Sequence, residues 1–189
     1  MDEKILGSDH QYLSEHIEWI TDTYKKKGES KRAFEFCQEK LADWKKKLGE
    51  SHSAVAQTLQ IMAALIENSN GDKALECYNQ ALIILETGSP PDHVATAKCL
   101  SNISLVYWRY DMFDDALKFR LRALEIEQRI HSSDHINIAI SLRWIGLIYS
   151  KMANYPKALE FLTNGLKIYT ANYSLQHEDI KQTQNYIAE

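Results

Sequence analysis

The chain lacks the paired cysteines and the long apolar runs that mark several classes of protein. Its three cysteines, Cys37, Cys77 and Cys99, lie far apart and leave an odd count, so neither a disulfide framework nor a paired metal-ligand spacing is indicated. Nowhere do 18 apolar residues follow one another, and no apolar segment follows Met1, so neither a membrane span nor a secretion signal is predicted. We therefore expect a cytoplasmic protein.

The charge balance and the missing catalytic motifs narrow the function. A formal net charge of -4 argues against general binding to nucleic acid or to a membrane surface. The sequence contains no glycine-rich phosphate loop, no His-Glu-x-x-His helix and no Gly-x-Ser-x-Gly turn. His131 and His135 come nearest to a metal pair, but they span a predicted loop, which favours a structural role. We expect no catalytic residue, no cofactor and no metal.

What the chain does have is a histidine marker that returns at intervals of 42, 41, 42 and 42 residues. A fixed period in this range predicts stacked repeats, each of which buries its apolar face only against its neighbours. We expect one array over residues 1–189, with repeats at about 10–51, 52–92, 93–134 and 135–176, and a partial fifth repeat or capping helix at 177–189. The markers are Asp9-His10, Ser51-His52, Asp92-His93, Asp134-His135 and Gln176-His177.

Alignment on the marker predicts two helices in each repeat, and strand signals are absent. Apolar residues stand 7, 10 and 14 positions after the histidine, a spacing that puts them on one face of a first helix, helix A. Small residues stand 11 positions after it, and alanines about 23 positions after it open a second apolar stretch, helix B, where backbones must meet closely. The histidines and the Asp or Ser before them are expected to cap helix A.

This pattern resembles the tetratricopeptide repeat, in the 42-residue form found in kinesin light chains. The resemblance is carried by Leu100-Ser101-Asn102-Ile103-Ser104, Tyr107 and the Ala-Leu pairs at 116–117 and 123–124 in the third repeat. It extends from about Asp9 to the C-terminus, but the proline that usually follows the marker histidine is missing from every copy. The resemblance implies an all-α, right-handed α-solenoid of helix-turn-helix repeats, about four plus a terminal helix, with A helices lining a concave groove.

The resemblance also implies which residues face that groove. Asn102 matches the family asparagine that clamps an extended peptide backbone, and Trp108 and Trp144 are large apolar anchors. An alternative for Trp144 is that it fills space between adjacent A helices. Arg109, Arg143 and Lys151 favour a protein or peptide partner with apolar anchors and acidic residues. The expected groove residues are Lys98, Ser101, Asn102, Leu105, Trp108, Arg109, Arg143, Trp144, Leu147 and Lys151.

The sequence therefore predicts a non-catalytic module that binds a peptide or helix of a partner protein, as an adaptor or scaffold. Two alternatives stay open: a self-associating scaffold that forms homo-oligomers through the solenoid ends, and the regulatory or targeting part of a larger enzyme. RNA binding in the groove is disfavoured by the acidic charge balance.

Overall fold

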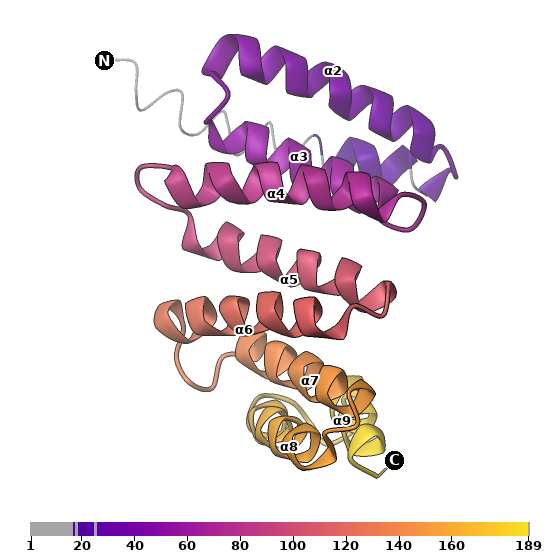
Figure 1. Ribbon diagram of the computed structural model, residues 1–189, viewed down its shortest axis with the longest axis vertical. Helices are drawn as coiled ribbons and strands as arrows, with labels where there is room; N and C mark the ends of the chain where they lie inside the picture. Colours follow the sequence, from indigo (N-terminus) through magenta and orange to yellow (C-terminus); the bar gives the residue numbers. More distant parts are fainter. Residues whose placement is uncertain (1–16, 18, 25, 189) are drawn as a thin grey trace. The chain divides into compact units, whose positions relative to one another are not determined.

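The computed structural model describes residues 17, 19–24 and 26–188. Every regular element in these residues is an α-helix (Figure 1), which confirms the all-α prediction. The chain divides into two compact units, Met1–Asp92 and His93–Glu189, and each is described by itself. Asp9 and His10 of the first marker lie outside the described residues.

The first unit contains α2 (Ser30–Leu48), α3 (Ser53–Ile66) and α4 (Gly71–Thr87), with residues 19–24 helical before them. Helix α3 is the most apolar of the three because it packs against both α2 and α4. Its residues Val55 and Leu59 are buried, as is Tyr78 on α4.

The second unit contains α5 (His93–Arg109), α6 (Phe113–Ile130), α7 (Ile136–Lys151), α8 (Tyr155–Asn172) and α9 (Glu178–Ala188). Each helix packs on the next along the chain, as the ribbon shows (Figure 1). The pairs α5–α6 and α7–α8 are helices A and B of the third and fourth repeats, and α9 follows as a further helix A. One core cluster joins Leu124, Leu142 and Ile145, and a second joins α7 and α8 to Ile180 of α9.

Helices A and B approach most closely at the small residues. Ala63, Ser104 and Gly146, each 11 positions after a marker histidine, are buried. The Ser104 hydroxyl donates to the backbone oxygen of Ala116 on the next helix at 2.7 Å. A Cβ on Gly146 would lie 2.7 Å from Leu162 Cγ and 3.1 Å from the backbone oxygen of Ala158. A larger side chain at this position would push the two helices apart.

A pair of stacked aromatic rings joins helix A to helix B in the α5–α6 pair and in the α7–α8 pair. Tyr107 stacks on Phe119 with ring centroids 5.4 Å apart, and Tyr149 stacks on Phe161 at 5.6 Å. All four rings are half-buried. The tyrosines 14 positions after the marker are thus packed between helices, as the sequence predicts.

The marker histidines cap helix A with their own side chains. Nδ1 of His52 accepts from the backbone N–H of Ala54 at 3.1 Å, and Nδ1 of His135 accepts from that of Asn137 at 3.2 Å. His177 makes the same bond at the start of α9. The predicted capping role is confirmed for these three histidines. Asp134, by contrast, accepts from the Ser132 hydroxyl within the loop.

We expect Gly146→Val to lower the free energy of unfolding by about 1–3 kcal/mol, because the added methyl groups overlap Leu162 and the α8 backbone. Ser150→Val, at an exposed position of the same helix, controls for placing a β-branched side chain in α7 and should cost less than about 0.5 kcal/mol. Urea unfolding of both variants measures the difference. Equal losses would show that the close approach at Gly146 is not stabilising.

We expect His135→Ala to destabilise the protein by about 0.5–2 kcal/mol, because the N–H of Asn137 loses its acceptor. His135→Asn keeps a capping acceptor and should recover most of that loss, although both variants remove the ring stack of His135 on His131. Thermal unfolding by circular dichroism compares the two. An asparagine variant no more stable than the alanine variant would contradict the capping role.

Candidate functional site

The ten predicted groove residues all lie on α5 and α7 of the second unit. We call these ten residues the A-helix face. Seven of them are half-buried, and Lys98, Arg109 and Lys151 are exposed. Within the described part of the chain, the half-buried carboxamide of Asn102 makes no hydrogen bond, so its donors and acceptor remain available to a ligand.

The two tryptophans of this face contact each other. Trp108 and Trp144 meet edge to face with centroids 5.8 Å apart, and Trp108 also packs on Phe113 at 5.4 Å. The guanidinium carbon of Arg120 lies 5.8 Å from the centre of the Trp144 ring. These contacts agree with the alternative interpretation of Trp144 as a filler between neighbouring A helices. Both rings are only half-buried, so each still offers apolar surface.

Arg143 is engaged by the last helix instead of being free for a partner. Its Nη1 donates to Asp179 at 2.7 Å and to Gln182 at 3.5 Å, both on α9. Its guanidinium carbon also lies 5.4 Å from the centre of the Tyr169 ring. The prediction that Arg143 adds positive charge to the groove therefore needs correction, because Asp179 neutralises that charge. Lys98 and Lys151 keep exposed side chains on the same face.

The structure also reveals a buried charged pair on α6 that the sequence analysis missed. Arg120 is 2% exposed and Glu127 is 6% exposed. Each stands four residues after a buried alanine, Ala116 or Ala123. This spacing places both charges on the buried stripe of helix B, and it could have identified them from the sequence.

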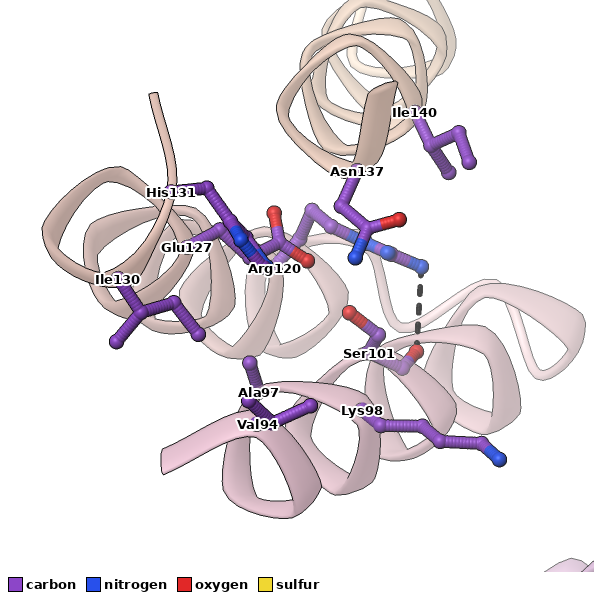
Figure 2. A pocket seen from close by; sticks show the side chains of 10 residues that line it. All are labelled: Val94, Ala97, Lys98, Ser101, Arg120, Glu127, Ile130, His131, Asn137 and Ile140. Atoms are coloured by element: carbon purple, nitrogen blue, oxygen red, sulfur yellow. Dashed lines mark hydrogen bonds between the residues drawn. The ribbon is translucent and has the colours of Figure 1, made fainter. Parts of the chain in front are cut away.

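These two residues line a pocket of about 270 Å³ between α5, α6 and α7 (Figure 2). Lys98 and Ser101 of the A-helix face line it as well, together with Ile140 of α7. Arg120 Nη2 donates to the backbone oxygen of Ser101 at 3.2 Å. The pocket is therefore continuous with the A-helix face and reaches from it to the buried stripe of α6.

Burial perturbs both charged groups of the pocket. It lowers the pKa of the Arg120 guanidinium to about 10, and the Glu127 carboxylate opposes that shift. Burial also raises the pKa of Glu127. The Ser141 hydroxyl, Arg120 and His135 act in the opposite direction and lower this pKa, but burial has the larger effect. Desolvation thus outweighs the mutual attraction of the pair in both cases, as expected for charges removed from water.

The paired histidines, possible metal sites and possible membrane spans were the other features to consider in the described residues. His131 and His135 stack face to face with centroids 3.7 Å apart, and Nδ1 of His135 is occupied as a helix cap. In residues 17, 19–24 and 26–188, no three side chains of His, Cys, Asp or Glu form a group that could hold a metal ion. None of the helices described there is long and apolar enough to cross a lipid bilayer.

Comparison with known proteins identifies the repeat. The sequence profile of the tetratricopeptide repeat matches residues 62–126 and 111–171. No curated protein sequence matches the chain significantly.

Several solved structures share the fold at low sequence identity. One is a structure of nearly identical TPR-like repeats from a Podosopora anserina protein described as a kinesin light chain. It superposes with a TM-score of 0.79 at 16% sequence identity, and the match covers 92% of this chain and 82% of that chain. BtubC (BKLC) from P. vanneervenii superposes with a TM-score of 0.81 at 20% sequence identity, and the match covers 95% of this chain and 76% of that chain. The apo form of RapI superposes with a TM-score of 0.74 at 19% sequence identity, and the match covers 87% of this chain and 44% of that chain. At these identities the likeness is one of fold.

We expect a measurable coupling of about 1 kcal/mol between Arg143 and Asp179, because the pair is mostly shielded from water. A double-mutant cycle with alanine at each position, followed by urea unfolding, measures it. The exposed pair Arg129 and Glu125 on α6 serves as a matched control and should couple by less than about 0.5 kcal/mol. Equal coupling in the two pairs would show that Arg143 is not specifically held by α9.

Proposed function

Because the chain belongs to the tetratricopeptide repeat family, we propose that it is a non-catalytic adaptor or scaffold that binds a peptide or helix of a partner protein. Tetratricopeptide repeat domains generally bind proteins. The observation that carries the proposal is the A-helix face, where the unpaired carboxamide of Asn102 lies among half-buried apolar side chains on α5 and α7.

The chemistry of this face favours a partner with apolar anchors. Leu105, Trp108, Trp144 and Leu147 are each half-buried, so they expose apolar area without collapsing into the core. Partial exposure of large side chains next to a polar group is typical of a peptide-binding surface. An extended segment could place alternate side chains against these residues while its backbone bonds to Asn102.

The charge of the face favours acidic residues in the partner. With Arg143 paired to Asp179, exposed cations of this face are Lys98 in the first half of α5 and Lys151 at the end of α7. Exposed cations at a rim mainly steer the encounter and select the partner. An acidic stretch beside an apolar anchor therefore fits this surface best.

We expect Asn102→Ala combined with Lys151→Glu to weaken peptide binding at least about tenfold, because one hydrogen-bonding clamp and one attractive charge are lost. The peptides are selected from a random 16-residue display library on the intact chain, and their binding is then measured by fluorescence anisotropy. Circular dichroism checks that the variant keeps its helices.

The matched control is Asn164→Ala combined with Lys167→Glu, which makes the same changes at exposed positions of the B helix α8. This control should bind the selected peptides as the unaltered chain does. Equal binding by the control and the A-helix variant would overturn the proposed surface.

Self-association is the second candidate, and one observation favours it. Tyr186 on the last described helix, α9, is 38% exposed, and Leu175 before that helix is 71% exposed. Exposed apolar side chains that lie together can bind a second copy of the chain. A molecular mass that rises with protein concentration in analytical ultracentrifugation would favour self-association over a monomeric peptide-binding module.

A further inference from the structure

The third repeat places charges where the other repeats place core residues. The buried stripe of helix B has the same spacing in every repeat: Ala33, Cys37, Lys40 and Trp44; Ala74, Tyr78, Ala81 and Leu85; Ala116, Arg120, Ala123 and Glu127; Ala158, Leu162, Gly165 and Tyr169. Arg120 thus stands where Tyr78 and Leu162 stand, and Glu127 where Leu85 and Tyr169 stand. Those four residues are buried, so the fold accepts apolar or aromatic side chains at both positions.

Two buried charges are costly compared with such residues. Replacing a buried pair by packed apolar side chains is often neutral or stabilising. Stability alone therefore gives no reason for Arg120 and Glu127 to replace a leucine and a tyrosine. A strongly perturbed charged pair in a pocket is instead a candidate for binding.

The pair is only partly satisfied by the protein. Arg120 Nε, Glu127 Oε2 and the Ser101 hydroxyl are buried and make no hydrogen bond of normal geometry among the described residues, although the buried Ser141 hydroxyl lies near enough to Glu127 to lower its pKa. All three residues line the pocket, and Figure 2 shows their polar groups directed toward its interior. The pocket thus offers one donor, one acceptor and one hydroxyl that can act as either. Buried groups of this kind are normally paired.

An ionic ligand that contacts both Arg120 and Glu127 meets one like charge in the pocket. A carboxylate would meet Glu127, and an ammonium or guanidinium group would meet Arg120 and Lys98 at the rim. His131 from the end of α6 and the nearby His135 are the other titratable groups on this side. A neutral ligand with a donor and an acceptor on the same side matches both Arg120 and Glu127 without repulsion.

We propose that this pocket binds a primary carboxamide, the side chain of an asparagine or glutamine in the partner. The amide oxygen would accept from Arg120 Nε–H, and the amide NH₂ would donate to Glu127 Oε2. Val94, Ala97, Ile130 and Ile140 supply apolar walls for the methylene groups. A backbone amide fits less well because its N–H and C=O point in opposite directions. A volume of about 270 Å³ suits one side chain better than a drug-sized ligand, which needs about 300–1,000 Å³.

The proposal rests on the proposed function, because the carboxamide would belong to a segment lying on the A-helix face. Ser101 and Lys98 belong to both surfaces, and Arg120 contacts Trp144 of the face. A partner segment that binds along α5 and α7 could therefore insert one side chain into the pocket.

The test uses propionamide, the side-chain analogue of glutamine, and solution NMR of the intact chain. Propionamide should shift the Arg120 Nε–Hε resonance in a saturable way. It should bind at least about tenfold more tightly than propionate, propylammonium or N-methylpropionamide, since each of these loses a bond or adds repulsion. A lack of any saturable shift, or equal binding of propionate, would overturn the proposal.

Glu127→Gln sharpens the test because it removes the negative charge of the pocket and leaves Arg120 unbalanced. In this variant propionate should bind more tightly than propionamide, which reverses the preference. Glu125→Gln makes the same change at an exposed position of α6 and should keep the original preference. An unchanged preference in Glu127→Gln would overturn the proposal. If Glu127→Gln does not fold by circular dichroism, the titration of the unaltered chain decides alone.

The experiments distinguish a failure of the carboxamide pocket from a failure of peptide binding by the A-helix face. Propionamide binding without any selected peptide would retain the pocket and reject peptide binding by the A-helix face. Peptide binding without a propionamide effect would retain the face and reject the pocket.

Discussion

The close approach of helix A to helix B within each repeat is the contact on which the other features depend. At Gly146 the backbone leaves no room for a Cβ beside Leu162 and Ala158, and at Ser104 the hydroxyl bonds directly to the backbone of the next helix. Because the backbones meet there, the larger side chains on either side are forced outward in fixed directions. One set enters the core between helices, and the other set forms the A-helix face.

The buried stripe of helix B shows how far this geometry tolerates change. In the second to fourth repeats its alanine and glycine positions are all small, although Lys40 stands at one of them in the first repeat, whereas the other positions accept cysteine, tyrosine, leucine or a charged residue. The tolerance arises because these side chains lie between successive A helices instead of at the backbone contact. In the third repeat this freedom allows Arg120 and Glu127 to line a pocket that opens toward the A-helix face.

Helix α9 changes the electrostatics of the A-helix face. By pairing with Asp179 and covering Tyr169, Arg143 becomes part of the contact between α7, α8 and α9. The same ion pair orients α9, whose Ile180 fills the adjacent core. Arg143 thus holds α9 against α7 and α8, and Asp179 neutralises its charge. Lys98 on α5 and Lys151 at the end of α7 keep exposed charge on this face.

The sequence by itself determined the repeat, its length, the A and B helices and the small residues between them, because a 42-residue period and helical spacing are local properties of the chain. It also located the capping histidines and the A-helix face. Only the tertiary structure decided that Arg143 is paired, that Trp108 and Trp144 contact each other, and that Arg120 and Glu127 meet in a pocket. The pairing of Arg143 with Asp179 and the contact of Trp108 with Trp144 each join residues 36 positions apart. Spacing within one repeat places Arg120 and Glu127 on the buried stripe, but it carries no information on contacts between repeats, because these form only when neighbouring repeats stack.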